Sequence, residues 1–150
     1  MKDYQAVAVS ITNRRRDLFI LQKKDGGYYI PQFRFKCCFF GGRVEDGEEE
    51  YSALRRELLE ELDQKIAERI YEKSKKIVPD YKIIDALGRN CTYSLYESIL
   101  STRLLKKIAS MPVKEGEAAV LIKKEDIFKA PFFSDLREVL EDYLLRQKHS

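Results

Sequence analysis

The sequence predicts a single α/β domain that spans residues 1–150. Its 150 residues are enough to bury one core, and a hydrophobic content of 44% is typical of a globular chain. Strand-like segments precede and follow a central amphipathic helix, and a second amphipathic helix lies near the end of the chain. This order of strands, helix, strands and helix indicates helical layers packed on a sheet.

The first half of the chain predicts three strands and the central helix. The first two strands carry alternating or continuous apolar residues, and turn-like segments separate all three. The helix has acidic residues in its first turn, which favour the helix dipole, and an apolar stripe along one side. The predicted elements are strands at Gln5–Thr12, Asp17–Lys23 and Lys36–Phe40, followed by a helix at Glu49–Leu62.

The second half predicts three more strands and a C-terminal amphipathic helix, whose apolar side is Leu136, Val139, Leu140, Tyr143 and Leu144. Two further segments have helical patterns, of which Arg103–Ala109 is ambiguous. The predicted elements are helices at Lys65–Lys76, Arg103–Ala109 and Asp135–Arg146, with strands at Tyr81–Leu87, Thr92–Leu100 and Glu117–Ile122.

Three acidic residues of the central helix share one face. At about 100° per residue, Glu57, Glu60 and Glu61 fall within an arc of roughly 100°. Such carboxylates repel one another unless a cation lies among them. Hard oxygen donors suit Mg²⁺ or Mn²⁺ rather than Zn²⁺, and the one histidine, His149, is far away in sequence. A solvated acidic face is the alternative interpretation.

The residues around this cluster follow a specific spacing. Gly42 is followed after five residues by Glu48, and seven more residues lead to Arg56 and Glu57. The complete segment resembles the Nudix box, GX5EX7REUXEEXGU, in which U is aliphatic. The positions that match in register are Gly42, Glu48, Arg56, Glu57, Leu58, Glu60 and Glu61. Asp63 and Gln64 depart from the family's glycine and aliphatic residue. The helix is therefore expected either to end near Asp63 in a left-handed turn or to continue towards Lys65.

The resemblance implies a Nudix-type α/β/α sandwich with a mixed β-sheet. It also implies that Glu57, Glu60 and Glu61 hold the metal, together with the backbone carbonyl of Gly41. Glu48 and Arg56 are expected to form an ion pair that fixes the loop against the helix, and Arg56 also to orient a catalytic carboxylate. Gly42 and Leu58 are expected to be structural.

The implied reaction is metal-assisted hydrolysis of a diphosphate linkage. A glutamate from a later loop is expected to act as base or as a further ligand. Glu117 is the first choice because it lies nearest the start of a predicted strand, and Glu115 is close behind. Ordinary exposed loop acids explain either residue at least as well.

Three functional hypotheses follow. The favoured one is a nucleoside triphosphate pyrophosphohydrolase that releases monophosphate and pyrophosphate. The second is hydrolysis of a nucleoside diphosphate linked to another group, such as a sugar or ADP-ribose. The third is a non-catalytic ligand-sensing or interaction domain, which the complete set of acidic box residues disfavours.

Composition restricts partners and location. A net charge of +3 gives no reason to expect a nucleic-acid or membrane partner, and Arg14–Arg16 are expected in a solvated turn. Three cysteines without a metal or disulfide spacing indicate a reducing cytoplasm. A homodimer is implied by the resemblance only. The aromatic residues between Tyr28 and Phe40 can stack on a base, but most are expected to be core. Contact with phosphates is one interpretation of Lys23, Lys24 and Arg34, and solvated charges at a strand edge are the expected one.

Overall fold

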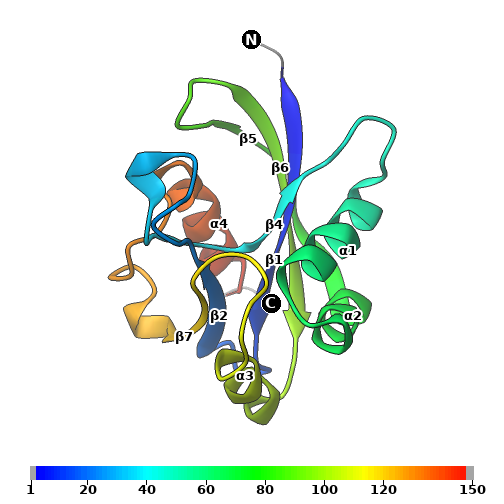
Figure 1. Cartoon of the computed structure of the whole chain (residues 1–150), viewed down its shortest axis with the longest axis vertical. Coiled ribbons are helices and arrows are strands. Elements are labelled where there is room, and N and C mark those ends of the chain that lie inside the picture. The colour runs from blue at the N-terminus through cyan, green and yellow to red at the C-terminus, as the bar shows by residue number, and fades with distance from the viewer. Residues whose placement is uncertain (1–2, 148–150) are drawn as a thin grey trace.

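The computed structural model describes residues 3–147, which form a seven-stranded sheet with helices on both faces (Figure 1). His149 lies outside the described residues. The elements are, in chain order, β1 (Tyr4–Thr12), β2 (Leu18–Lys23), β3 (Cys37–Cys38), β4 (Phe40–Arg43), α1 (Glu50–Glu61), α2 (Gln64–Lys73), β5 (Ser74–Ile84), β6 (Asn90–Ile99), α3 (Thr102–Ala109), β7 (Ala118–Lys123) and α4 (Arg137–Gln147).

The sheet is mixed, as predicted. Its main path runs β3-β2-β1-β6-β5, with β4 paired to β1 and β7 paired to β2. The long β1–β6 pair is parallel, whereas the other named pairs are antiparallel. The helix layers on both sides of this mixed sheet give the predicted α/β/α sandwich (Figure 1).

The sheet divides between β1 and β2. These strands pair only at one end, where Ile11 and Thr12 lie opposite Ile20 and Phe19. Beyond that point β4 pairs with β1 and β3 pairs with β2. The single strand predicted at Lys36–Phe40 is therefore two short strands that join different halves of the sheet.

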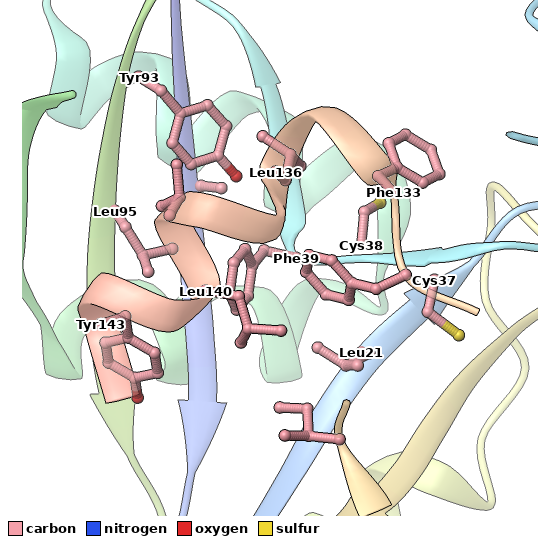
Figure 2. Close-up of a cluster of buried hydrophobic side chains, with 14 of the residues drawn as sticks. Leu21, Cys37, Cys38, Phe39, Tyr93, Leu95, Phe133, Leu136, Leu140 and Tyr143 are labelled. Atoms are coloured by element: carbon pink, nitrogen blue, oxygen red, sulfur yellow. The ribbon is translucent and has the colours of Figure 1, made fainter. Parts of the chain in front are cut away.

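Alternation along β1 supplies both cores. Ala8 faces a cluster beneath α4, whereas Val7 and Val9 face a cluster beneath α1, α2 and α3. Figure 2 shows the first cluster, in which Leu140 and Tyr143 of α4 pack near Phe39 and Leu95. All five predicted apolar residues of the C-terminal helix segment are buried, which confirms that prediction; they are Leu136, Val139, Leu140, Tyr143 and Leu144.

The departure from the box pattern at Asp63 changes the helix end. Helix α1 ends at Glu61, and Leu62 is extended rather than left-handed. Asp63 then caps α2, because its carboxylate accepts hydrogen bonds from the backbone N–H groups of Lys65 and Ile66 at 3.1 and 3.3 Å. Asp63 stands where the family pattern has glycine, and its carboxylate caps the start of the next helix.

Two predicted boundaries, the end of α2 and the start of β5, are wrong. The helix ends at Lys73 rather than Lys76, since Ser74 begins β5 opposite Ser98. The predicted strand at Tyr81–Leu87 captures only the end of β5, whose pairing with β6 is irregular between Lys76 and Tyr81.

The ambiguous segment Arg103–Ala109 is helical, and the Ser101 hydroxyl caps α3 by accepting a hydrogen bond from the backbone N–H of Leu104 at 3.1 Å. No described helix is long and apolar enough to cross a membrane.

Candidate functional site

Two glycines bring the backbone of β4 against α1. Gly41 and Gly42 lie opposite Ala8 and Val7 of β1. Gly41 has a φ of +153°, and a Cβ there would collide with the backbone of Val7 and Ala8. A Cβ on Gly42 would collide with the carboxyl group of Glu57. Gly41 is therefore needed for close approach to β1, and Gly42 because the strand passes directly under a carboxylate.

Arg56 fixes the loop that leads from β4 into α1. Its guanidinium donates to both carboxylate oxygens of Glu48, at 2.8 and 3.0 Å, and to the carbonyl of Arg43 at 2.9 Å. The hydrogen bonds from Arg56 hold the pKa of Glu48 below its usual range. Arg56 also donates to Glu57 at 3.0 Å and to Glu60 at 3.3 Å. It thereby joins the loop to two of the candidate metal ligands.

Glu61 is a buried carboxylate at the division of the sheet. Its side chain is only 1% exposed, and one oxygen accepts a hydrogen bond from the backbone N–H of Gly41 at 3.2 Å. Burial raises the pKa of Glu61 to about 8, and the negative charges of Glu57 and Glu115 add to that rise, while Lys24 and Gln22 oppose it. No Lys or Arg among residues 3–147 forms an ion pair with it.

The donor set fits a divalent cation. Burial raises the pKa of Glu57 as well, and the charges of Glu60 and Glu115 contribute to that rise although Arg56 opposes it. A cation among these oxygens would remove that repulsion. In the described part of the chain, no three His, Cys, Asp or Glu side chains converge as a ready-made metal site. Glu57 and Glu60 instead point to Arg56, so binding requires their carboxylates to turn towards Glu61.

The two loop glutamates occupy different surroundings. Glu115 is close enough for its charge to raise the pKa of both Glu57 and Glu61. Glu117, the first choice from the sequence, lies 3.8 Å from the ammonium group of Lys23. Glu115 therefore contributes to the raised pKa of two candidate metal ligands, whereas Glu117 lies beside Lys23.

Sequence reasoning missed a polar network beside Glu61. The ammonium group of Lys24 donates to the Gln22 side-chain oxygen at 2.8 Å and lies 4.9 Å from the centre of the Tyr28 ring. The Cys38 thiol donates to the same oxygen at 3.7 Å. Lys24 was expected to be solvated, but it turns inward. The alternation along β2, which puts Gln22 on the face of Ile20, is the only sequence signal for this placement.

An aromatic cavity lies on the other side of the divided sheet. It measures about 120 Å³, and its lining includes Tyr4, Tyr28, Tyr93 and Phe133. Asp135 also lines it: one carboxylate oxygen accepts from Ala86 N at 3.2 Å, and the other is buried without a partner among the described residues. Figure 2 shows Tyr93 and Phe133 at this end of the core.

Acidic groups at the cavity and at the carboxylate site both affect the pKa of Cys38. Burial raises the pKa of the Cys38 thiol to about 12, and the charges of both Glu61 and Asp135 contribute to the rise. Lys24 connects the same two places, because it contacts Gln22 near Glu61 and Tyr28 at the cavity. A ligand that occupies both places would therefore pass Lys24.

The aromatic residues between Tyr28 and Phe40 are mainly core. Phe33, Phe39 and Phe40 are buried, as expected. Tyr29 and Phe35 are instead exposed, at 67% and 53%, on the loop beside the cavity.

Comparison with known proteins identifies the class. A sequence model described as the NUDIX domain matches residues 2–142, and no curated protein sequence matches the chain. The fold is similar to that of a MutT protein from Methanosarcina mazei Go1, with a TM-score of 0.65, 14% identity and coverage of 97% of this chain and 96% of that one. It is also similar to a mutT/nudix family protein from Listeria innocua, with a TM-score of 0.68, 14% identity and coverage of 99% and 96%. A MutT NUDIX hydrolase from Burkholderia pseudomallei has a TM-score of 0.64, 17% identity and coverage of 94% and 98%.

The chain belongs to the Nudix family. This family hydrolyses phosphoric anhydrides and generally uses divalent metals such as Mg²⁺. At these identities the solved structures support the fold alone.

Proposed function

We propose that this chain is a Mg²⁺- or Mn²⁺-dependent pyrophosphohydrolase that converts a nucleoside triphosphate into a monophosphate and pyrophosphate. The observation that carries the proposal is Glu61, a carboxylate that is 1% exposed and has no ion-pair partner in the described chain. A buried carboxylate without an ion-pair partner costs stability, and such groups concentrate at functional sites. Its neighbours Glu57 and Gly41 supply further oxygen atoms suited to the same cation.

Each of the candidate site residues has a separate role in the proposed reaction. Glu57, Glu60, Glu61 and the Gly41 carbonyl would hold the metal. When bound, that ion supplies positive charge to phosphoryl oxygens and lowers the pKa of a water molecule. Glu115 would accept the proton of the attacking water, since it is the loop glutamate whose charge reaches Glu57 and Glu61. The water oxygen then joins phosphorus, and the bond from phosphorus to the leaving pyrophosphate oxygen breaks.

The aromatic cavity supports a nucleoside as the rest of the substrate. Aromatic rings such as Tyr28 and Phe133 offer faces on which a base can stack. The unpartnered oxygen of Asp135 can accept a hydrogen bond from a base N–H group. Lys24, which contacts Tyr28 and Gln22, would then meet the phosphate chain between the cavity and Glu61.

The direct test is a panel of nucleotides incubated with the protein and Mg²⁺, with products identified by mass. Release of monophosphate and pyrophosphate from a nucleoside triphosphate supports the proposal. Cleavage confined to nucleotide sugars or ADP-ribose would favour the second hypothesis, and no release from any diphosphate compound would favour a ligand-sensing domain. We place the enzyme in the cytoplasm because Cys37, Cys38 and Cys91 are free thiols; a homodimer stays a prediction.

A matched pair of variants tests the assignment of the metal ligands. Glu60 is 46% exposed, so Glu60→Gln should preserve the fold while abolishing turnover. Glu72→Gln makes the same change at an exposed position of α2 and should leave turnover unaltered. Full activity in Glu60→Gln would show that the metal site is assigned to the wrong residues.

A further inference from the structure

A basic hollow lies at the end of the sheet where β1 and β6 finish. Its volume is about 480 Å³, within the range of ligand pockets. Arg14 and Arg15 from the β1–β2 turn line it, together with Arg69 and Lys73, which lie one helical turn apart on α2. Ser101 and Thr102 at the start of α3 complete the wall, so three separate elements converge there (Figure 1).

The cations around this hollow lack partners. Arg14, Arg15, Arg69 and Lys73 form no ion pair with any carboxylate of residues 3–147, and no acidic residue lines the hollow. Arg16, the next residue of the turn, behaves differently, because it turns away to pair with the buried Glu97 at 2.9 Å. The expectation of a solvated turn at Arg14–Arg16 is therefore wrong for Arg16.

Local backbone structure adds to this positive charge and orders it. Thr102 begins α3, so the positive end of the helix dipole lies at the hollow. The Asn13 side chain donates to the Thr102 hydroxyl at 3.0 Å, which ties the arginine-bearing turn to the helix start. The turn that carries Arg14 and Arg15 is therefore hydrogen-bonded to the start of α3 and is not an independent loop.

The hollow is separate from the candidate catalytic site. Gly41 lies opposite Ala8 of β1, whereas Asn13 follows the end of that strand five residues later. At about 3.3 Å per residue, the two places are roughly 17 Å apart along the strand. The hollow therefore lies apart from Gly41, whose backbone N–H donates to Glu61.

We infer that this hollow is a second ligand site, which binds a short phosphate chain. Arg side chains form bidentate contacts with phosphate oxygens, and several cations around one concave space match a compact, multiply charged anion. A concave site bounded by three elements suits a small polyphosphate better than a nucleic-acid strand, which would need an extended basic stripe. The phosphate chain can be free or part of a nucleotide.

The test is an NMR titration of the ¹⁵N-labelled protein with sodium tripolyphosphate, at constant ionic strength and in EDTA. We expect saturable shifts at the backbone amides of Arg14, Arg15 and Thr102. The double variant Arg69→Glu/Lys73→Glu should weaken binding at least tenfold. Lys106→Glu/Lys107→Glu makes the same charge change at exposed positions of α3 outside the hollow and should bind as the wild type does.

Further arms separate the sources of the phosphate. Equal binding of tripolyphosphate and a nucleoside triphosphate would mean that the chain alone is recognised, whereas tighter nucleotide binding at the same amides would assign the site to nucleotides. Arg14→Ala/Arg15→Ala, in an exposed turn, provides an independent loss of binding if the α2 variant does not fold. The inference would be overturned if no amide shifts saturably, or if the shifts are confined to the surroundings of Lys24. It would also be overturned if the protein binds only a single-stranded oligonucleotide, or if the hollow variants bind tripolyphosphate as the wild type does. None of these outcomes depends on hydrolysis.

Discussion

Two buried glutamates, Glu61 at the end of α1 and Glu97 on β6, have opposite surroundings. Glu97 is 5% exposed and accepts hydrogen bonds from Arg16 at 2.9 and 3.1 Å, from Tyr143 at 2.6 Å and from Gln147 at 3.0 Å. Glu61 is 1% exposed and accepts a hydrogen bond from the backbone N–H of Gly41 at 3.2 Å, without an ion pair among the described residues.

The pKa values record the difference. Burial by itself raises the pKa of Glu97, but the hydrogen bonds from Arg16, Tyr143 and Gln147 outweigh it and lower the pKa. Burial raises the pKa of Glu61 to about 8, because desolvation outweighs the opposing effects of Lys24 and Gln22, and the charges of Glu57 and Glu115 add to the rise. A carboxylate that stabilises the fold has its partners within the chain, whereas Glu61 has a place for a cation from outside.

The largest expected effect follows removal of the Glu61 charge. Glu61→Gln should lower kcat/KM with Mg²⁺ on the order of 10³-fold, about 4 kcal/mol of transition-state stabilisation. The melting temperature in EDTA should stay the same or rise, because a neutral amide of similar shape replaces a buried carboxyl group that has no ion-pair partner among the described residues. Steady-state kinetics and thermal unfolding measure both quantities, and a large loss of stability would place Glu61 in the same class as Glu97.

Glu97→Gln should show the reverse behaviour. The loss of the charge-assisted bonds to Arg16 should lower the free energy of unfolding by about 2–3 kcal/mol, because the contact between the guanidinium and a buried carboxylate is broken. Below the melting transition, kcat/KM should match that of the wild type. Urea unfolding and kinetics at one temperature give the two values, and loss of activity without loss of stability would remove the contrast between the glutamates.

The two carboxylates should give opposite dependences of stability on pH. Between the unfolded pKa of about 4.3 and the folded pKa of about 8, the native state keeps a proton on Glu61 that the unfolded state has lost. The contribution of Glu61 to stability therefore falls as pH rises, by at most about 1.4 kcal/mol per pH unit. The lowered pKa of Glu97 makes its contribution complete above about pH 4.3, and acid removes it.

Urea unfolding in EDTA between about pH 5 and pH 8 separates these contributions. The stability of the wild type should decline relative to that of Glu61→Gln as pH rises through this interval. Parallel curves for the two proteins would contradict the raised pKa of Glu61.

The smallest of the four effects concerns the cation that partly offsets Glu61. Lys24→Ala should raise KM for the nucleotide about tenfold, roughly 1.4 kcal/mol, because a phosphate contact made in both ground and transition states is lost. Lys23→Ala is the matched control, since Lys23 pairs with Glu117 instead. Equal KM values for both variants would exclude Lys24 from substrate binding.

The sequence was sufficient for the fold and the carboxylate face. Period-2 and period-3.6 patterns predicted most elements, and the box spacing predicted the family. β5 was predicted poorly because it contains Pro79 and irregular pairing near Lys76 and Tyr81, which interrupt the strand pattern. The division into β3 and β4 depends on long-range pairing with β2 and β1, which no local pattern encodes.

Side-chain environments were harder to predict. Glu57, Glu60 and Glu61 lie on one helix face, but only the tertiary structure distinguishes a buried Glu61 from a half-exposed Glu60. The roles of Lys24 and Asp135 arise where β2 and the segment before α4 approach the same divided sheet. Contacts between residues so far apart in sequence leave no spacing signal.

Metal binding tests the central claim most directly. Isothermal titration of the wild type, Glu61→Gln and Glu97→Gln with Mn²⁺ alone compares the two buried carboxylates without substrate. The wild type and Glu97→Gln should bind Mn²⁺ with equal affinity, whereas Glu61→Gln should bind at least about tenfold more weakly. Unaltered Mn²⁺ affinity in Glu61→Gln would contradict the conclusion that this carboxylate is buried to hold a cation.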